Sequence, residues 1–187
     1  MSNGYTRLWY GVEDSNIIKA IDFYQSRILD LKKQQLLEEY NFSVTGNVPF
    51  QDWELFGAIL VGDKKSEGYG SDLTRHEIKS AVTGNSFEYQ YHRNHGEDKL
   101  IEDIELDWHV FISYSRDYRN IVVRRVPGSA LEPTFRSWLA GLRDAYTGPN
   151  PRQRYRRSIS YGWVAENGEI ILQIKGGLRV ANHPPLF

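Results

Sequence analysis

The residues best suited to chemistry lie close together in the chain, where Asp72 is followed by Glu77, Ile78 and Lys79. If this segment forms a strand, Glu77 and Lys79 point to one face and Ile78 to the other, because side chains alternate along a strand. Ile78 then anchors the strand in a core, while an acid and a base lie side by side at its surface. Asp72 returns to them across a tight turn. Two carboxylates and an ammonium in this arrangement can bind a hard divalent cation through oxygen, with the lysine beside the group under attack.

The string Asp72…Glu77-Ile78-Lys79 resembles the acid…Glu-x-Lys motif of the PD-(D/E)XK nucleases, the family of many type II restriction endonucleases. The resemblance implies a restriction-endonuclease-like α/β fold, with a mixed β-sheet flanked by α-helices. It implies that Asp72, Glu77 and the carbonyl of Ile78 bind Mg²⁺. It also implies that Asp72, Glu77 and Lys79 are catalytic, with Lys79 assisting the water that attacks a phosphodiester.

The sequence does not determine which acids would complete the metal site. Ser71 stands where the family often has proline, and only four residues separate the two acids of the motif, so Asp63 is an alternative to Asp72. Glu38 or Glu39, at the end of an expected helix, could add a further carboxylate. The simpler interpretation of these two glutamates is an acidic last turn exposed to solvent.

A second segment could bind nucleic acid. No acid occurs between residues 145 and 165, and this interval contains a run of four arginines with one glutamine and one tyrosine. Arginine suits phosphates and guanine, and glutamine suits adenine, although a solvated strand entry would have the same composition. A polar string farther upstream faces either DNA or solvent. The candidate DNA-binding residues are Arg152, Gln153, Arg154, Tyr155, Arg156, Arg157, His92, Arg93 and Asn94.

Composition limits the class of protein. A chain of 187 residues with 40% hydrophobic and 25% charged residues predicts one domain over residues 1–187. The net charge of -1 argues against a protein that coats DNA passively, but it permits a nuclease whose positive charge is confined to its binding site.

The chain has no cysteine, which excludes disulfides and thiolate zinc sites. No apolar run approaches the length of a spanning helix, and residues 1–10 lack the apolar stretch of a signal peptide, so we expect a cytoplasmic protein without a membrane partner.

Hydrophobic spacing predicts the order of elements. Helices are expected over 14–40 with Asp14 or Ser15 as N-cap, from 97 onward, and over 129–147 with Ser129 and Glu132 as a capping box. Strands are expected over 55–61, 77–82, 107–114 and 120–126, followed by a hairpin of 157–164 and 169–174 with its turn at 166–168. This order predicts a mixed sheet flanked by helices.

The residues and the resemblance together predict a magnesium-dependent endodeoxyribonuclease that cuts duplex DNA at a short specific site. A palindromic target would call for a homodimer, with one active site on each strand. Two alternatives remain. The first is a structure-specific repair or junction nuclease of the same fold. The second is a non-catalytic module that holds nucleic acid with its arginines and its aromatic residues.

Overall fold

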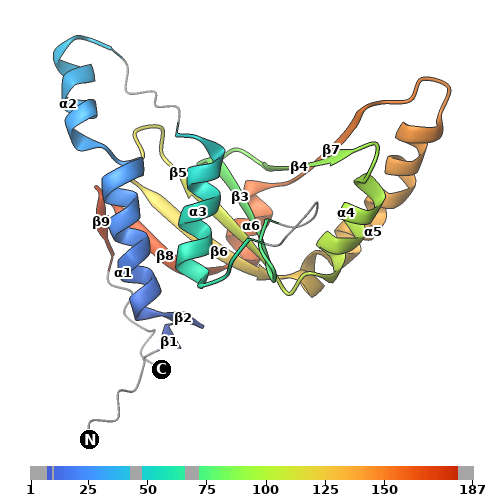
Figure 1. The fold of residues 1–187 in the computed structure, drawn as a ribbon, viewed down its shortest axis with the longest axis horizontal. Helices are drawn as coiled ribbons and strands as arrows, with labels where there is room; N and C mark the ends of the chain where they lie inside the picture. The colour runs from blue at the N-terminus through green and yellow to red at the C-terminus, as the bar shows by residue number, and fades with distance from the viewer. Residues whose placement is uncertain (1–7, 10, 43–47, 66–71, 181–187) are drawn as a thin grey trace, which may run out of the picture.

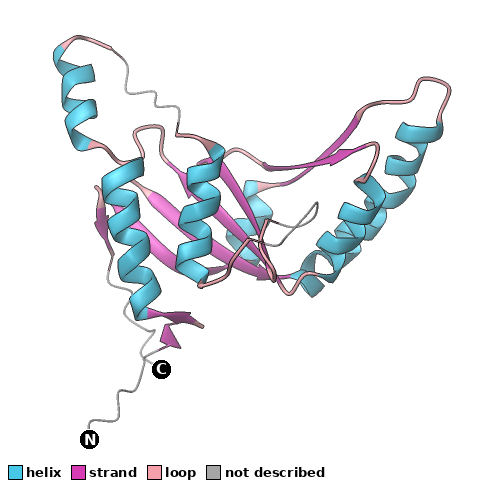
Figure 2. Cartoon of the chain, in the orientation of Figure 1, coloured by secondary structure: helices cyan, strands magenta, loops and turns pink. Residues whose placement is uncertain are grey.

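The computed structural model describes residues 8–9, 11–42, 48–65 and 72–180 of the chain. Figure 1 shows the course of the chain, and Figure 2 shows its helices and strands. In chain order the elements are β1 (Leu8–Trp9), β2 (Val12–Glu13), α1 (Asp14–Phe23), the π-helical turn η1 (Tyr24–Ile28), α2 (Leu31–Glu39), α3 (Phe50–Val61), β3 (His76–Val82), β4 (Phe87–His92), α4 (Gly96–Glu105), β5 (Trp108–Tyr114), β6 (Ile121–Pro127), α5 (Gly128–Thr147), β7 (Arg154–Ile159), α6 (Tyr161–Asn167), β8 (Glu169–Lys175) and β9 (Leu178–Arg179).

A mixed five-stranded sheet forms the centre of the molecule, in the order β3-β5-β6-β8-β9. β3 and β5 run parallel, and every other neighbouring pair in this sheet is antiparallel. The segment between β3 and β5 contains β4 and α4, so β4 leaves the sheet. β4 pairs antiparallel with β7 in a separate two-stranded ribbon.

Each face of the sheet is covered by its own apolar core. On one face, Ile78, Val110 and Ile112 pack with side chains of α1 and α3 such as Ile17 and Phe56. On the other face, Phe111 and Val126 pack with the apolar sides of α4, α5, α6 and the β4–β7 ribbon. Figure 1 shows a V-shaped outline, with α1, α2 and α3 in one arm and α4 and α5 in the other. The protein is therefore a mixed α/β fold with a sheet flanked by helices, as the sequence predicted.

Several predicted elements are confirmed. The strand that carries Glu77 and Lys79 is β3, and the expected strands over 107–114 and 120–126 are β5 and β6. The helix expected from residue 97 is α4, and the helix expected over 129–147 is α5. The capping box was wrong, because Pro127 is the N-cap of α5 without a side-chain cap, and Glu132 pairs with Arg136.

The strand predicted over 55–61 is wrong, because this segment belongs to the helix α3. Its buried residues are Trp53, Phe56, Gly57 and Leu60, spaced by one and three positions, which is the period of a helix. A short run of apolar residues fits a buried helix as well as a buried strand. Gly62, with φ of 71°, ends the helix in the left-handed conformation.

The single helix predicted over 14–40 is divided in the structure. α1 continues into the wider turn η1, and Asp30 then adopts φ of 35° and caps α2 by accepting a hydrogen bond from the Lys33 amide. The predicted caps Asp14 and Ser15 are also wrong, since Glu13 precedes the first turn without a side-chain cap. A local aspartate cap therefore interrupts an apolar stripe that looked continuous.

The hairpin predicted over 157–174 is wrong. Residues 161–167 form the helix α6, whose first turn is capped by the Ser160 hydroxyl, which accepts a hydrogen bond from the Trp163 amide at 3.2 Å. The strand before α6 pairs with β4, and the strand after it pairs with β6. Among the described residues, no helix combines the length and the apolar character needed to cross a membrane.

Gly57 generates a prediction about how α3 supports β3. A Cβ atom at Gly57 would lie 2.9 Å from both Cγ2 and Cδ1 of Ile78, the residue between the two charged members of the motif. We expect Gly57→Val to lower the free energy of unfolding by roughly 1–3 kcal/mol, because overpacking forces the strand or its side chain to move. Urea denaturation measures this change. Gly162→Val in α6 is the control, since a Cβ there meets no atom within 4 Å; equal stability of the two variants would contradict the prediction.

Candidate active site

The motif lies at an open edge of the central sheet. β3 is the terminal strand of the sheet, and its only strand neighbour among the described residues is β5. The Ile78 amide points to the outer edge, where it donates a hydrogen bond to Asp72 Oδ2 at 3.1 Å. The N–H and C=O groups of one residue point the same way in an extended strand, so the Ile78 carbonyl opens on this edge too.

The turn before β3 brings the two acids of the motif together. While Asp72 accepts from the Ile78 amide, its own amide donates to Glu77 Oε2 at 3.0 Å. These two hydrogen bonds fix both carboxylates at the start of the strand. Lys79 Nζ lies 2.5 Å from Glu77 Oε1 and 4.0 Å from Asp72 Oδ2. The predicted side-chain alternation thus places Glu77 and Lys79 on one side of β3, and the turn brings Asp72 beside them at the edge of the sheet.

Helix α4 adds two charged residues that the sequence analysis missed. Lys99 Nζ donates to Glu77 Oε2 at 3.0 Å and also forms an ion pair with Asp103, one helical turn away. Asp103 is fully buried and accepts a further hydrogen bond from the Tyr91 hydroxyl at 3.0 Å. The available signal was the spacing of Asp103 with Leu100 and Ile104, which puts the acid on the buried face of the helix.

The two lysines determine the charge of Glu77. Burial alone would raise the pKa of this carboxyl, which is 1% exposed. The ammonium groups of Lys79 and Lys99 outweigh burial and lower the pKa of Glu77 to about 2. In turn, burial would lower the pKa of Lys79, but Glu77 and Asp72 raise it above its usual value. Both groups of the motif are therefore charged at neutral pH.

The two other acids of the cluster respond differently. Burial, and then repulsion from Glu77, raise the pKa of Asp103 to about 7 despite the neighbouring Lys99. Burial and repulsion from Glu77 also raise the pKa of Asp72. The three carboxylates of Asp72, Glu77 and Asp103 thus share two ammonium groups. The repulsion that remains raises the pKa of Asp72 and of Asp103.

Beneath the cluster lies a buried histidine in its neutral form. His109 Nε2 lies 3.0 Å from the Asp103 carbonyl, which can only accept, so Nε2 carries the proton. His109 Nδ1 then accepts a hydrogen bond from the Tyr89 hydroxyl at 2.9 Å. Burial lowers the pKa of His109 to about 4, in agreement with this tautomer. The ring of Tyr89 in turn lies 4.9 Å from Lys79 Nζ.

A fourth acid approaches from the opposite arm of the fold. Glu54 of α3 lines a small cavity of about 200 Å³ together with Trp53, Ile78, Lys79 and other residues. Burial and the charge of Asp72 raise the pKa of Glu54. Sequence analysis missed Glu54 because its helix was predicted as a strand that began one residue later.

The alternative acids named from the sequence have other partners. Asp63 Oδ2 lies 2.7 Å from His76 Nδ1 and accepts a hydrogen bond from the Arg75 amide, so this carboxylate holds the start of β3. Glu38 is exposed and lies 3.9 Å from Arg119. Glu39 is exposed as well. Ser71 lies outside the described residues. Among the acids predicted from sequence, Asp72 and Glu77 are the pair that surrounds Lys79.

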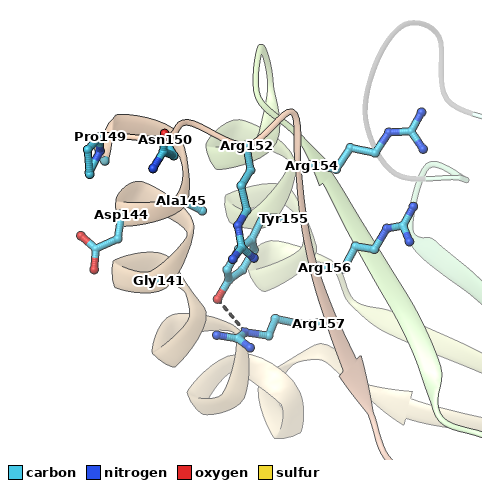
Figure 3. Close-up of a pocket in the computed structure, with 11 residues that line it drawn as sticks. Gly141, Asp144, Ala145, Pro149, Asn150, Arg152, Arg154, Tyr155, Arg156 and Arg157 are labelled. Carbon is cyan, nitrogen blue, oxygen red and sulfur yellow. Dashed lines mark hydrogen bonds between the residues drawn. The ribbon is translucent and has the colours of Figure 1, made fainter.

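The arginine segment lies in the β4–β7 ribbon and divides between two faces. Figure 3 shows Arg154 and Arg156 pointing to one side of β7, and Arg152, Tyr155 and Arg157 pointing to the other. The second side borders a pocket of about 510 Å³ against the end of α5. The ring of Tyr155 is buried and its hydroxyl accepts a hydrogen bond from Arg157, so this candidate DNA-binding residue packs inside the ribbon.

The upstream candidates lie at the same ribbon. His92 is exposed at the end of β4, opposite Arg154 in the register. Arg93 and Asn94 follow in an exposed turn, and the Arg93 amide donates to the Gln153 carbonyl at 3.0 Å. The fold therefore brings both segments predicted to bind DNA to one edge of the molecule.

No protein-family model and no curated protein sequence matches the chain. Within the described parts of the chain, no three histidine, cysteine, aspartate or glutamate side chains form a group that could hold a metal ion by themselves. A cation bound at the edge of β3 would therefore have to be completed by a carbonyl, by water or by substrate oxygens.

His109 makes stability depend on pH. Its pKa is lowered to about 4 in the folded protein, from an ordinary value of 6.5, so between these values the unfolded chain binds a proton that the folded chain does not. His109 therefore contributes a fall in the free energy of unfolding as pH falls through this window, approaching about 1.4 kcal/mol per pH unit, while Asp103, whose pKa is raised to about 7, contributes with the opposite sign. His109→Gln should remove this part of the slope in urea denaturation at a series of pH values. The same substitution at exposed His92 is the comparison variant, and an equal slope in wild type and His109→Gln would refute the assignment.

Proposed function

We propose that the protein is a magnesium-dependent endodeoxyribonuclease of the PD-(D/E)XK type, acting on duplex DNA at a specific site as type II restriction enzymes do. The observation that carries this proposal is the proximity of Asp72 and Glu77 to Lys79 at the open edge of β3. The mixed sheet flanked by helices is compatible with the restriction-endonuclease-like fold that the motif implies.

The donor set at this edge fits a hard divalent cation. Asp72 and Glu77 offer carboxylate oxygens, and the Ile78 carbonyl opens on the same edge. The carboxylates of Asp72 and Glu77 also repel each other, and a cation between them would relieve this repulsion. When bound, Mg²⁺ supplies a water of lowered pKa and neutralises charge that develops at phosphorus.

The residues of the chain then have separate tasks. Asp72 and Glu77 would hold the cation, and the hydrogen bonds that their carboxylates accept from the Ile78 and Asp72 amides keep them in place without substrate. Lys79 keeps its proton on Nζ, because its pKa is raised, so it acts by charge and hydrogen bonding rather than as a base. Its ammonium can exchange a carboxylate oxygen for an oxygen of the scissile phosphate or orient the attacking water. Lys99 remains paired with Glu77 and Asp103, so Glu77 keeps one ammonium partner when Lys79 turns to the phosphate.

Substrate binding is assigned to the β4–β7 ribbon. Exposed Arg154 and Arg156 lie on one face of it, and His92 belongs to the same pair of strands. Basic side chains of this kind contact the phosphates or the base edges of duplex DNA. If the target is palindromic, a homodimer places one such site on each strand.

A non-catalytic nucleic-acid-binding module is the second candidate. The exposed arginines of the ribbon favour it equally, and the lysines of the cluster can neutralise Glu77 without a metal ion. A structure-specific repair or junction nuclease would share the proposed site and would differ in substrate only. Cleavage that requires magnesium separates the nucleases from the binding module, and branched and linear DNA substrates separate the two kinds of nuclease.

The test of the proposal is magnesium-dependent cleavage and its dependence on Lys79. Wild-type protein should convert plasmid DNA to discrete fragments with Mg²⁺ and leave it intact with EDTA. Lys79→Met should lower the cleavage rate by roughly 10²–10⁴-fold, since an ammonium at the reacting phosphate is lost, while DNA retention in a gel-shift assay persists.

Lys175→Met at the exposed end of β8 is the matched control and should cleave like the wild type. Circular dichroism establishes that both variants are folded. Cleavage by folded Lys79→Met at the wild-type rate would overturn the role of Lys79. DNA retention without cleavage under any magnesium concentration would favour the binding module.

A further inference from the structure

The β4–β7 ribbon has two chemically different faces. One face consists of buried apolar side chains that pack with α4 and α5, among them Tyr89, Tyr91 and Ile159. The other face is polar and exposed, with Glu88 opposite Ser158, Gln90 opposite Arg156 and His92 opposite Arg154. A two-stranded ribbon is one of the elements that the major groove of B-DNA admits.

The middle of the polar face is a connected set of side chains. Arg156 Nε donates a hydrogen bond to Gln90 Oε1 at 3.0 Å and lies 3.8 Å from Glu88 Oε1. Both contacts use Nε, which orients the guanidinium of Arg156. Its two terminal nitrogens form the fork that can bind guanine O6 and N7 together.

The composition of this set suits base edges better than phosphates. Glu88 is about as exposed as Arg156, at 55% and 54% of the side chain, and a carboxylate repels a phosphate. A carboxylate does accept a hydrogen bond from the cytosine amino group, and a glutamine pairs with adenine. Arg154 and His92 lie opposite each other at the end of the ribbon. Neither is paired with an acid in the β4–β7 register, so both suit phosphate contacts.

Strand β4 carries the polar face on one side and contacts the proposed catalytic cluster from its other side. Tyr89 stands between Glu88 and Gln90 in β4, and its ring on the reverse face lies 4.9 Å from Lys79 Nζ. The position of the polar face is therefore coupled to Lys79 through a single strand.

We infer that Glu88, Gln90 and Arg156 read base edges in the major groove of duplex DNA, with guanine bound by Arg156, while Arg154 and His92 hold flanking phosphates. The inference rests on the proposed function and names the residues that determine its sequence preference. It predicts that loss of Arg156 changes which sequences are bound, and that loss of Arg154 weakens binding to all sequences.

The experiment is a binding selection from a library of duplexes with a randomised central segment, with sequencing of the bound fraction, followed by affinity measurements at several salt concentrations. Wild-type protein should select a short sequence that contains guanine. Arg156→Ala should lose the preference at one guanine position and bind the selected duplex roughly 5- to 140-fold more weakly, with affinity for an unrelated duplex unchanged. Gln90→Ala should relax the preference at an adjacent position.

Two variants serve as comparisons. Arg154→Ala should weaken binding to selected and unrelated duplexes alike and reduce the salt dependence by about one phosphate contact. Arg136→Ala removes an arginine of similar exposure on α5, where it pairs with Glu132, and should leave affinity and preference as in the wild type. The inference is overturned if Arg156→Ala weakens all duplexes equally, or if it behaves like Arg136→Ala.

The failure of this inference and the failure of the proposed function give different results. Magnesium-dependent cleavage at sites that do not depend on Arg156 or Gln90 would remove the reading role and leave the nuclease. A sequence preference that depends on Arg156, in a protein that never cleaves DNA, would support the reading role and remove the nuclease.

Discussion

The structure depends on one buried ion cluster at the edge of the central sheet. Glu77 is 1% exposed and lies between the ammonium groups of Lys79 and Lys99. A buried carboxylate without such partners would cost several kcal/mol, and removing one partner of a buried pair typically costs about 3–5 kcal/mol. The cluster therefore fixes the approach of α4 to β3, and it concentrates more acids than bases at an open sheet edge. The same arrangement that constrains the fold creates the proposed chemistry.

The connection between β3 and β5 links this cluster to the ribbon. β4 leaves the central sheet, pairs with β7, and returns through α4, which supplies Lys99 and Asp103 to the cluster. Tyr89 of β4 contacts the cluster through Lys79 and His109, while the opposite face of the same strand is exposed. One short segment thus couples the candidate catalytic residues to the candidate DNA surface. Recognition and cleavage would share a rigid frame, because both depend on the position of β4.

Local patterns in the sequence predicted the parts of the fold that depend on local interactions. Alternation around Ile78 placed Glu77 and Lys79 on one side of β3, and apolar spacing located α4 and α5. Glu54 was missed because an apolar run has the same composition in a buried helix and a buried strand. The pairing of β7 with β4 joins residues more than 60 positions apart, and no nearby pattern marks such a partner. Buried Lys99 and Asp103 resemble ordinary surface charges until α4 is placed against β3.

Binding of Mn²⁺, followed by electron paramagnetic resonance on the protein with a short DNA duplex, tests the central claim most directly. Mn²⁺ replaces Mg²⁺ at oxygen sites and reports occupancy without requiring turnover. The account predicts that wild-type protein binds Mn²⁺ and that Asp72→Asn weakens this binding at least about tenfold, as loss of a carboxylate ligand should. Asp144→Asn on α5 serves as the control and should bind like the wild type. Equal Mn²⁺ affinity in wild type and folded Asp72→Asn would contradict the account.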